Sequence, residues 1–161
     1  MSTKVFNLGD ENCPIAEKLG NFFATPFVID GVKCGSAEGF IQALKFRDLE
    51  KQRQVAALVG KEPKFKGKKA GKRIAREGTV FWCGLDFQFG SKEHLELIER
   101  GIRAKFEQSE ECRKALLETG NAQLVHETGR AESRFTSLPA REFIRIVSTI
   151  RDELQVFNGV K

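Results

Sequence analysis

The chain has 161 residues, of which 40% are apolar, and this is enough for one domain with a buried core. No apolar run approaches the roughly 20 residues that a membrane-spanning helix needs, and none follows Lys4 as a signal peptide would require. These features exclude an integral membrane protein and predict a soluble, cytoplasmic one. The 27 basic and 22 acidic residues give a net charge of +5, which is compatible with anionic partners without requiring them.

The first third of the chain is predicted to contain a β-hairpin followed by a long helical stretch. Residues 27–34 predict the hairpin, because Asp30-Gly31 suits a two-residue type I′ turn with positive φ at both positions. The helical stretch is expected to begin at the N-cap Ser36, with apolar residues at helical spacing, and to end near Gly60.

Residues 64–76 are densely basic and are predicted to form a loop that leads into a short helix. Gly67 and Gly71 favour the loop and allow close backbone approach to a phosphate, while the lysines between them supply positive charge. This segment is the natural anion site of the chain. It also suits a nucleic acid backbone, and the simplest alternative is a solvated loop.

The second half of the chain is predicted to be mainly helical. Ser91 is expected to cap an amphipathic helix, and Ser109 a second, shorter one. The first of these helices has apolar residues at i, i+3, i+7 and i+11: Leu95, Ile98, Ile102 and Phe106. Residues 124–126 predict a strand, and residues 139–156 a last helix with Pro139 at its first position. Without alternating strands and helices, the whole chain is predicted to be one α+β domain, mainly helical with a few short strands.

No metal site or cofactor is predicted from the spacing of ligand-type residues. Zinc sites usually contain ligand pairs separated by about two to five residues. The cysteines and histidines of this chain lie much further apart, at Cys13, Cys34, Cys83, His94, Cys112 and His126.

Several segments, taken in order and with their spacing, resemble the YbiA-like, or NADAR, superfamily. The resemblance covers residues 18–128 and is carried by Leu19–Phe27 with Asp30-Gly31, Ser36–Phe46, Lys68–Lys72 with Trp82, Ala104–Ser109, Leu116–Gly120 and Leu124-Val125. It implies a YbiA-like fold and hydrolysis of N-glycosidic bonds. The substrates of that family are ADP-ribose attached to guanine bases and ribosylamino-pyrimidine phosphates of riboflavin synthesis.

The chemistry of ribose C1–N cleavage points to Glu38 and Lys45 as catalytic residues. The reaction builds positive charge on the sugar, which a fixed carboxylate stabilises, or the carboxylate activates water. Glu38, Gln42 and Lys45 lie at i, i+4 and i+7, on one face of the predicted helix. Lys45 either binds phosphate or, as the family implies, forms a Schiff base with C1. A solvated polar stripe is the alternative for all three residues.

The remaining substrate-binding candidates are polar, basic or aromatic side chains. Asn21 is expected to bind a ribose hydroxyl or a phosphate, or else to satisfy the backbone of a turn. Lys69 and Lys72 are candidates for binding a pyrophosphate, and Gln42 completes the polar face. Trp82 is a candidate for stacking on the base, with packing in the core as an equal alternative.

The sequence departs from the family pattern at several positions, and two of these departures bear most on the site. Gly39 follows Glu38 where the family usually has histidine, and residues 129–141 lack the usual glycine and asparagine residues before the last helix. We therefore predict a divergent N-glycosidase that acts on ADP-ribosylated guanine nucleotides or nucleic acid. The alternatives are an enzyme for small phosphorylated ribosylamines and an inactive relative that binds ADP-ribose or nucleic acid.

Overall fold

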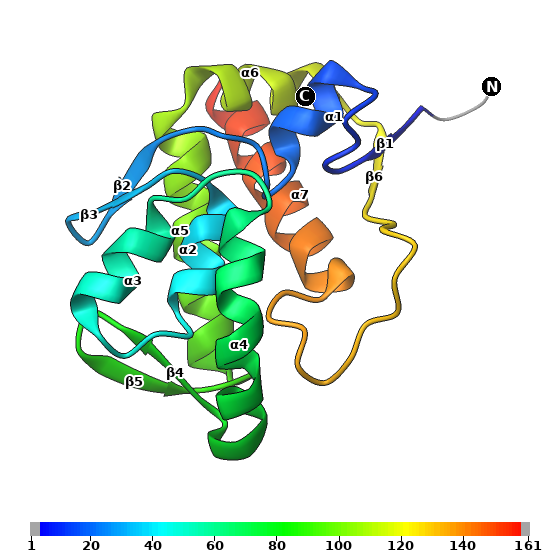
Figure 1. The fold of residues 1–161 in the computed structure, drawn as a ribbon. Coiled ribbons are helices and arrows are strands. Elements are labelled where there is room, and N and C mark those ends of the chain that lie inside the picture. Colours follow the sequence, from blue (N-terminus) through cyan, green and yellow to red (C-terminus); the bar gives the residue numbers. More distant parts are fainter. Residues whose placement is uncertain (1–3, 159–161) are drawn as a thin grey trace.

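A computed structural model describes residues 4–158, so both ends of the predicted domain 1–161 lie outside the described residues. Helices contribute most of the secondary structure, and the strands are short, which confirms the predicted α+β class (Figure 1). The elements in chain order are β1 (Val5–Asn7), α1 (Pro14–Leu19), β2 (Phe27–Ile29), β3 (Val32–Cys34), α2 (Ala37–Ala43), α3 (Leu49–Ala56), α4 (Glu62–Glu77), β4 (Thr79–Trp82), β5 (Leu85–Gln88), α5 (Lys92–Gln108), α6 (Glu110–Glu118), β6 (Gln123–Val125) and α7 (Ala140–Phe157).

The strands form three separate two-stranded sheets. β2 and β3 form the predicted hairpin, and its turn has φ values of 50° at Asp30 and 78° at Gly31, as a type I′ turn requires. β4 and β5 form a second antiparallel hairpin, while β1 and β6 pair in parallel. The β1–β6 pair joins the first and last thirds of the described chain.

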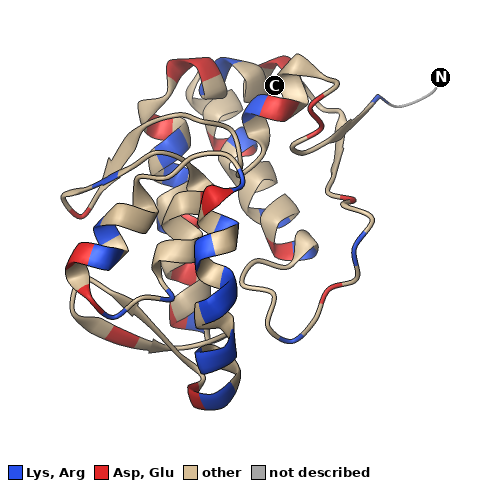
Figure 2. Ribbon diagram, in the orientation of Figure 1, with Lys and Arg blue, Asp and Glu red and all other residues tan. Residues whose placement is uncertain are grey.

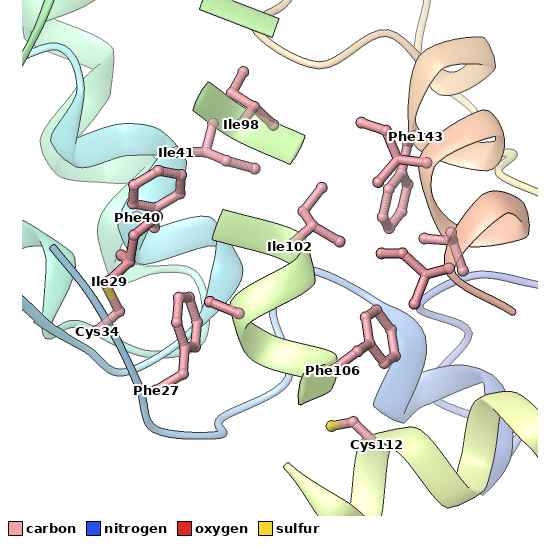
Figure 3. Close-up of a cluster of buried hydrophobic side chains, with 14 of the residues drawn as sticks. Phe27, Ile29, Cys34, Phe40, Ile41, Ile98, Ile102, Phe106, Cys112 and Phe143 are labelled. Carbon is pink, nitrogen blue, oxygen red and sulfur yellow. The ribbon is translucent and has the colours of Figure 1, made fainter. Parts of the chain in front are cut away.

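Helix α5 lies at the centre of the hydrophobic core (Figure 1). It contacts α2 on one side and α7 on the other. Figure 3 shows Ile98 and Ile102 of α5 between the side chains of Phe40 and Phe143. A Cβ atom at Gly101 would lie 2.2 Å from Cε2 of Phe40, so only glycine lets α2 approach α5 this closely. The core therefore fixes the position of α2.

The expected long helix from Ser36 to Gly60 is wrong, because the chain forms two helices there. Asp48 starts α3 by accepting a hydrogen bond from the backbone N–H of Lys51 at 2.9 Å. Gln52 then donates to the carbonyl oxygens of Ala43 at 3.3 Å and Phe46 at 2.9 Å. The break therefore has its own capping and hydrogen-bonding partners, which apolar spacing alone does not reveal.

The expected loop in residues 64–76 is also wrong, because these residues belong to the continuous helix α4. Each glycine inside a helix costs roughly 1 kcal/mol relative to alanine, which favoured the loop. Tertiary packing offsets this cost, since Pro63, Gly67 and Ile74 form a buried face of α4. The helix ends at Gly78, whose φ of 68° is left-handed.

The predicted helix caps are confirmed at three serines. The side chains of Ser36, Ser91 and Ser109 each accept a hydrogen bond from a backbone N–H three residues later. The last helix is confirmed as well, although Pro139 is its N-cap and not its first residue. Within residues 4–158, no helix is long and apolar enough to span a membrane.

Candidate functional site

The candidate site lies on the one polar face of α2. The Ser36 cap and the surrounding core bury six of the seven residues of this helix and leave Glu38 partly exposed. Gln42 lies one turn further along, and Lys45 follows directly after the helix. These are three of the predicted site residues, and the structure brings them together.

Helix α4 packs directly over this polar face. A Cβ atom at Gly67 would lie 1.8 Å from Oε1 of Gln42 and 3.3 Å from Cδ of Lys45. Gly67 is therefore needed for the close approach of α4 to α2, and not for approach to a phosphate. Oε1 of Gln42 is buried and has no hydrogen-bond partner among the described residues. Such an orphaned acceptor is uncommon in a protein core.

The carboxyl group of Glu38 has a raised pKa. Burial disfavours its charged form, while a hydrogen bond with Gln42 and the positive charges of Lys45 and Lys64 act in the opposite direction. The burial effect is the largest of these. Glu38 therefore keeps its proton at a higher pH than an exposed glutamate, as a general acid requires.

The amine of Lys45 has a lowered pKa. Burial disfavours the ammonium form, the nearby charge of Lys64 adds to this effect, and Glu38 opposes it. A lysine of this kind supplies more free amine near neutral pH, and the free amine is the nucleophilic form. The nucleophilic interpretation of Lys45 requires this free form.

His94 belongs to the same neighbourhood, although no spacing in the sequence marks it. Its side chain is buried in the first turn of α5, and its Nδ1 atom accepts a hydrogen bond from the backbone N–H of Gly90 at 3.0 Å. Burial and the positive charge of Lys45 lower its pKa to about 4. His94 is therefore a neutral imidazole with its proton on Nε2.

Asn21 and Lys105 support the start of α2 through the backbone. The carbonyl oxygen of Asn21 accepts a hydrogen bond from the N–H of Glu38 at 2.9 Å. Next to it, the carbonyl oxygen of Gly20 accepts a hydrogen bond from the buried amine of Lys105 at 2.8 Å. The structure therefore places Asn21 beside Glu38, and Lys105 holds the loop that carries it. Lys105 lies in segment 104–109, which resembles the YbiA-like superfamily, and this resemblance is the sequence feature that could have identified it.

Lys69 lines a basic hollow beyond the end of α2. The hollow has a volume of about 420 Å³ and is lined by Phe46, Arg47, Asp48, Lys69, Ala70 and Arg73. The guanidinium groups of Arg47 and Arg73 lie 5.0 and 4.9 Å from the ring centroid of Phe81. Arg73 also donates a hydrogen bond to the carbonyl oxygen of Lys45. One of the side chains that line the hollow, Arg73, therefore also contacts the backbone of Lys45.

A family model for bacteriophage protein GP30.3 matches residues 14–152, which is most of the chain. This chain belongs to the bacteriophage GP30.3 family. It is 33% identical over 140 residues to an uncharacterized 17.1 kDa protein in the Gp30–rIII intergenic region of Enterobacteria phage T4. That match covers 84% of this chain and 90% of the phage T4 protein.

The fold of this GP30.3-family chain is similar to that of the Escherichia coli protein YbiA. The NMR structure of YbiA matches with a TM-score of 0.61, covering 98% of this chain and 89% of that one. The two sequences are 21% identical in this comparison, so the similarity establishes the fold alone. The predicted YbiA-like fold is thereby confirmed.

The predicted stacking role of Trp82 is wrong in this GP30.3-family structure. Trp82 is only 2% exposed and packs edge-on against Phe40, so neither face of the indole is open to a base. Its Nε1–H donates to Asp30 at 2.8 Å, and Arg100 binds the same carboxylate through both of its oxygens. Trp82 therefore has the packing role that was its alternative.

Lys72 is not brought to the polar face of α2 either. It lies five residues after Gly67, which is about 140° around the helix axis, and its side chain is exposed. Lys72 therefore faces away from Gln42 and Lys45. Of the basic residues in α4, Lys64 is the one that acts electrostatically on both Glu38 and Lys45.

Close packing against the end of α3 explains Gly39, the main departure from the superfamily pattern in this GP30.3-family chain. A Cβ atom at Gly39 would lie 2.5 Å from the carbonyl oxygen of Ala56 and 2.8 Å from that of Leu58. A side chain there would collide with the end of α3, so the glycine leaves the Glu38 face intact. His126 does not replace the usual histidine, because it contacts Leu8 and Phe143 instead.

Proposed function

We propose that this protein hydrolyses N-glycosidic bonds and removes ADP-ribose from guanine bases. The observation that carries the proposal is the Glu38–Gln42–Lys45 face of α2, where burial raises the pKa of an acid and lowers that of an amine within two turns of helix. Opposite shifts in neighbouring groups are typical of catalytic sites, because they hold an acid and a nucleophile ready at one pH.

The two groups divide the reaction between them. Protonated Glu38 donates its proton to the ring oxygen of the ribose, and the ring opens to an iminium between C1 and the base nitrogen. The free amine of Lys45 then attacks C1, one proton passes from the Lys45 nitrogen to the base nitrogen, and the base leaves as an amine, so that C1 becomes an iminium with Lys45. Water hydrolyses this Lys45 iminium, which frees the sugar, regenerates the lysine amine and releases the proton that restores Glu38. The net reaction consumes one water and breaks one C–N bond.

The basic hollow beside Lys45 suits the pyrophosphate of ADP-ribose. Arg47, Lys69 and Arg73 present three cations at the end of the catalytic face. Guanidinium groups bind phosphate oxygens in a bidentate manner, and a lysine adds a point charge. Asp48 on the same rim is occupied with capping α3, and Asp86 forms an exposed ion pair with Arg47 at 3.7 Å. A bound phosphate would compete with Asp86 for Arg47.

A product assay with two substrates tests the proposal. The protein is incubated with an oligonucleotide that carries ADP-ribose on guanine and, separately, with a ribosylamino-pyrimidine phosphate, and products are identified by chromatography and mass spectrometry. We expect ADP-ribose release from the oligonucleotide, and we expect Glu38→Gln to abolish it. Release from the small phosphate alone would assign the enzyme to that substrate instead, and no turnover of either by folded protein would favour a binding role.

A further inference from the structure

The outward face of α4 carries a stripe of basic residues around one aromatic side chain. The members recur at i, i+4, i+7, i+11 and i+15, and they are Lys61, Phe65, Lys68, Lys72 and Arg76. At 100° per residue, all five lie within about 80° of one another and opposite the buried face of the helix. All five are exposed, and the stripe extends over about 22 Å. Figure 2 shows this run of positive charge along α4.

The cations of this region are not used within the protein for ion pairs. Residues 61–76 contain eight lysines and arginines, and none of them is in an ion pair with a carboxylate in residues 4–158. By contrast, exposed lysines of other helices, such as Lys92 and Lys114, pair with a glutamate four residues away. The acidic residues of α4, Glu62 and Glu77, lie at its two ends. The stripe is thus a dense and unneutralised positive surface.

The exposed ring of Phe65 is a second, independent observation that points to a ligand at this stripe. Its side chain is 72% exposed in the middle of this stripe, between Lys61 and Lys68. A solvated helix face gains nothing from an exposed phenylalanine, whereas an aromatic ring between cations matches a strand that has both phosphates and flat bases. A polyanion that consists of phosphates alone would bind the lysines and leave the ring without a partner.

We infer that the outward face of α4 binds single-stranded nucleic acid, with a base stacked on Phe65 and backbone phosphates on Lys61, Lys68, Lys72 and Arg76. This surface lies on the opposite side of α4 from Gly67 and the Glu38 face, so it is separate from the proposed hydrolytic site. The inference goes beyond the proposed function, because an unmodified strand carries no ADP-ribose for that site to remove.

Fluorescence anisotropy of a labelled, unmodified oligothymidylate, measured over a range of sodium chloride concentrations, tests the inference. The triple variant Lys61→Gln, Lys68→Gln, Lys72→Gln is expected to reduce the slope of log affinity against log salt by about 2, since each contact with a single strand contributes roughly 0.7. Phe65→Ala is expected to weaken binding about tenfold and to leave the slope unchanged. All four side chains are exposed, so these variants retain the core.

Matched controls remove the same number of positive charges, or one phenylalanine ring, from other parts of the surface. The triple variant Lys33→Gln, Lys92→Gln, Lys114→Gln removes three exposed lysines, and Phe157→Ala removes a phenylalanine that is 88% exposed. Both controls are expected to bind like the parent. Inorganic polyphosphate, which has no bases, is expected to bind the parent and Phe65→Ala equally.

Three results would overturn the inference: no binding of the oligonucleotide by the parent, equal losses in the control and stripe variants, or no effect of Phe65→Ala. Because the strand is unmodified and only binding is measured, these results do not depend on hydrolysis. Conversely, an inactive protein that still binds the strand through the stripe would contradict the proposed function and support this inference.

Discussion

Helices α2 and α4 pack against each other, yet their polar side chains differ in their exposure to solvent. The carboxyl group of Glu38 and the amine of Lys45, just after α2, are partly buried, and this partial desolvation shifts the pKa of Glu38 upward and that of Lys45 downward. The outward cations of α4 stand in water and form no ion pairs within the described chain. Burial therefore prepares groups to exchange protons or attack carbon, while exposure preserves charge for contact with a polyanion.

Helix α4 itself has one buried face and one exposed face. Its inner face carries Gly67, which has no side chain and so allows close packing on Gln42. Its outer face carries Phe65 and lysines that contribute little to the core. The difference between the faces predicts that inner substitutions alter catalysis and stability together, whereas outer ones alter binding alone.

The largest effect is expected for Glu38→Gln. The amide keeps the shape of the side chain but has no proton to donate, so kcat for ADP-ribose release is expected to fall by at least about 100-fold. Glu50→Gln is the matched control, because Glu50 lies in the first turn of the neighbouring helix α3 but is exposed. Equal activity of the Glu38→Gln variant and the parent would remove Glu38 from the mechanism.

A smaller but clear effect is expected from alanine at the two glycines of α4. Gly67→Ala places a Cβ on Oε1 of Gln42, so we expect a displaced Gln42, at least tenfold lower activity and a loss of about 1–3 kcal/mol in the free energy of unfolding. Gly71→Ala meets no atom within 4 Å and is expected to stabilise the protein by up to about 1 kcal/mol. Thermal unfolding and turnover of both variants measure this difference, and similar behaviour of the two would contradict the packing of α4 on α2.

The comparison of buried and exposed lysines extends to Lys105. Burial lowers the pKa of Lys105 to about 8 from 10.5, so between these pH values the unfolded state binds more protons than the folded state. The contribution of Lys105 to folding stability therefore rises with pH across this window, by up to about 3 kcal/mol.

Denaturant unfolding at pH 7 and pH 10 tests this contribution. From pH 7 to pH 10, the free energy of unfolding of the parent is expected to change more favourably than that of Lys105→Met. Lys114→Met, at an exposed position of α6, should retain the pH dependence of the parent. Identical pH profiles for Lys105→Met and the parent would show that the Lys105 amine is solvated in the folded protein.

The smallest effect on activity is expected for Trp82→Phe. The variant loses the hydrogen bond to Asp30 and some packing against Phe40, which together cost about 1–2 kcal/mol of unfolding free energy. KM for the substrate is expected to stay unchanged, because the indole has no open face. A raised KM with unchanged stability would restore the stacking role for Trp82.

Much of the fold could be predicted where a local signal and the tertiary structure agree. The Asp30-Gly31 turn and the caps Ser36, Ser91 and Ser109 each depend on residues within a few positions of one another. The break between α2 and α3 depends on Gln52, whose partners include Phe81, 29 residues further along the chain. Such distant partners leave no periodic trace in the sequence.

The candidate site could be predicted only as far as helical spacing and family resemblance extend. Spacing placed Glu38, Gln42 and Lys45 on one face, and the structure brings them together. His94 and Lys64 have no such signal, since they approach from α5 and α4 through tertiary packing. Trp82 was ambiguous because a lone tryptophan beside phenylalanine has the same local sequence in a core as in a binding site.

Covalent trapping tests the central claim, which is that the desolvated amine of Lys45 and the carboxyl of Glu38 cleave the bond to C1. The protein is mixed with the ADP-ribosylated guanine oligonucleotide, reduced with sodium borohydride and analysed by intact-protein and peptide mass spectrometry. We predict one added ADP-ribose on Lys45 in the parent and none in Lys45→Arg. Turnover by the parent without any adduct on Lys45, or an adduct that persists in Lys45→Arg, would contradict the claim.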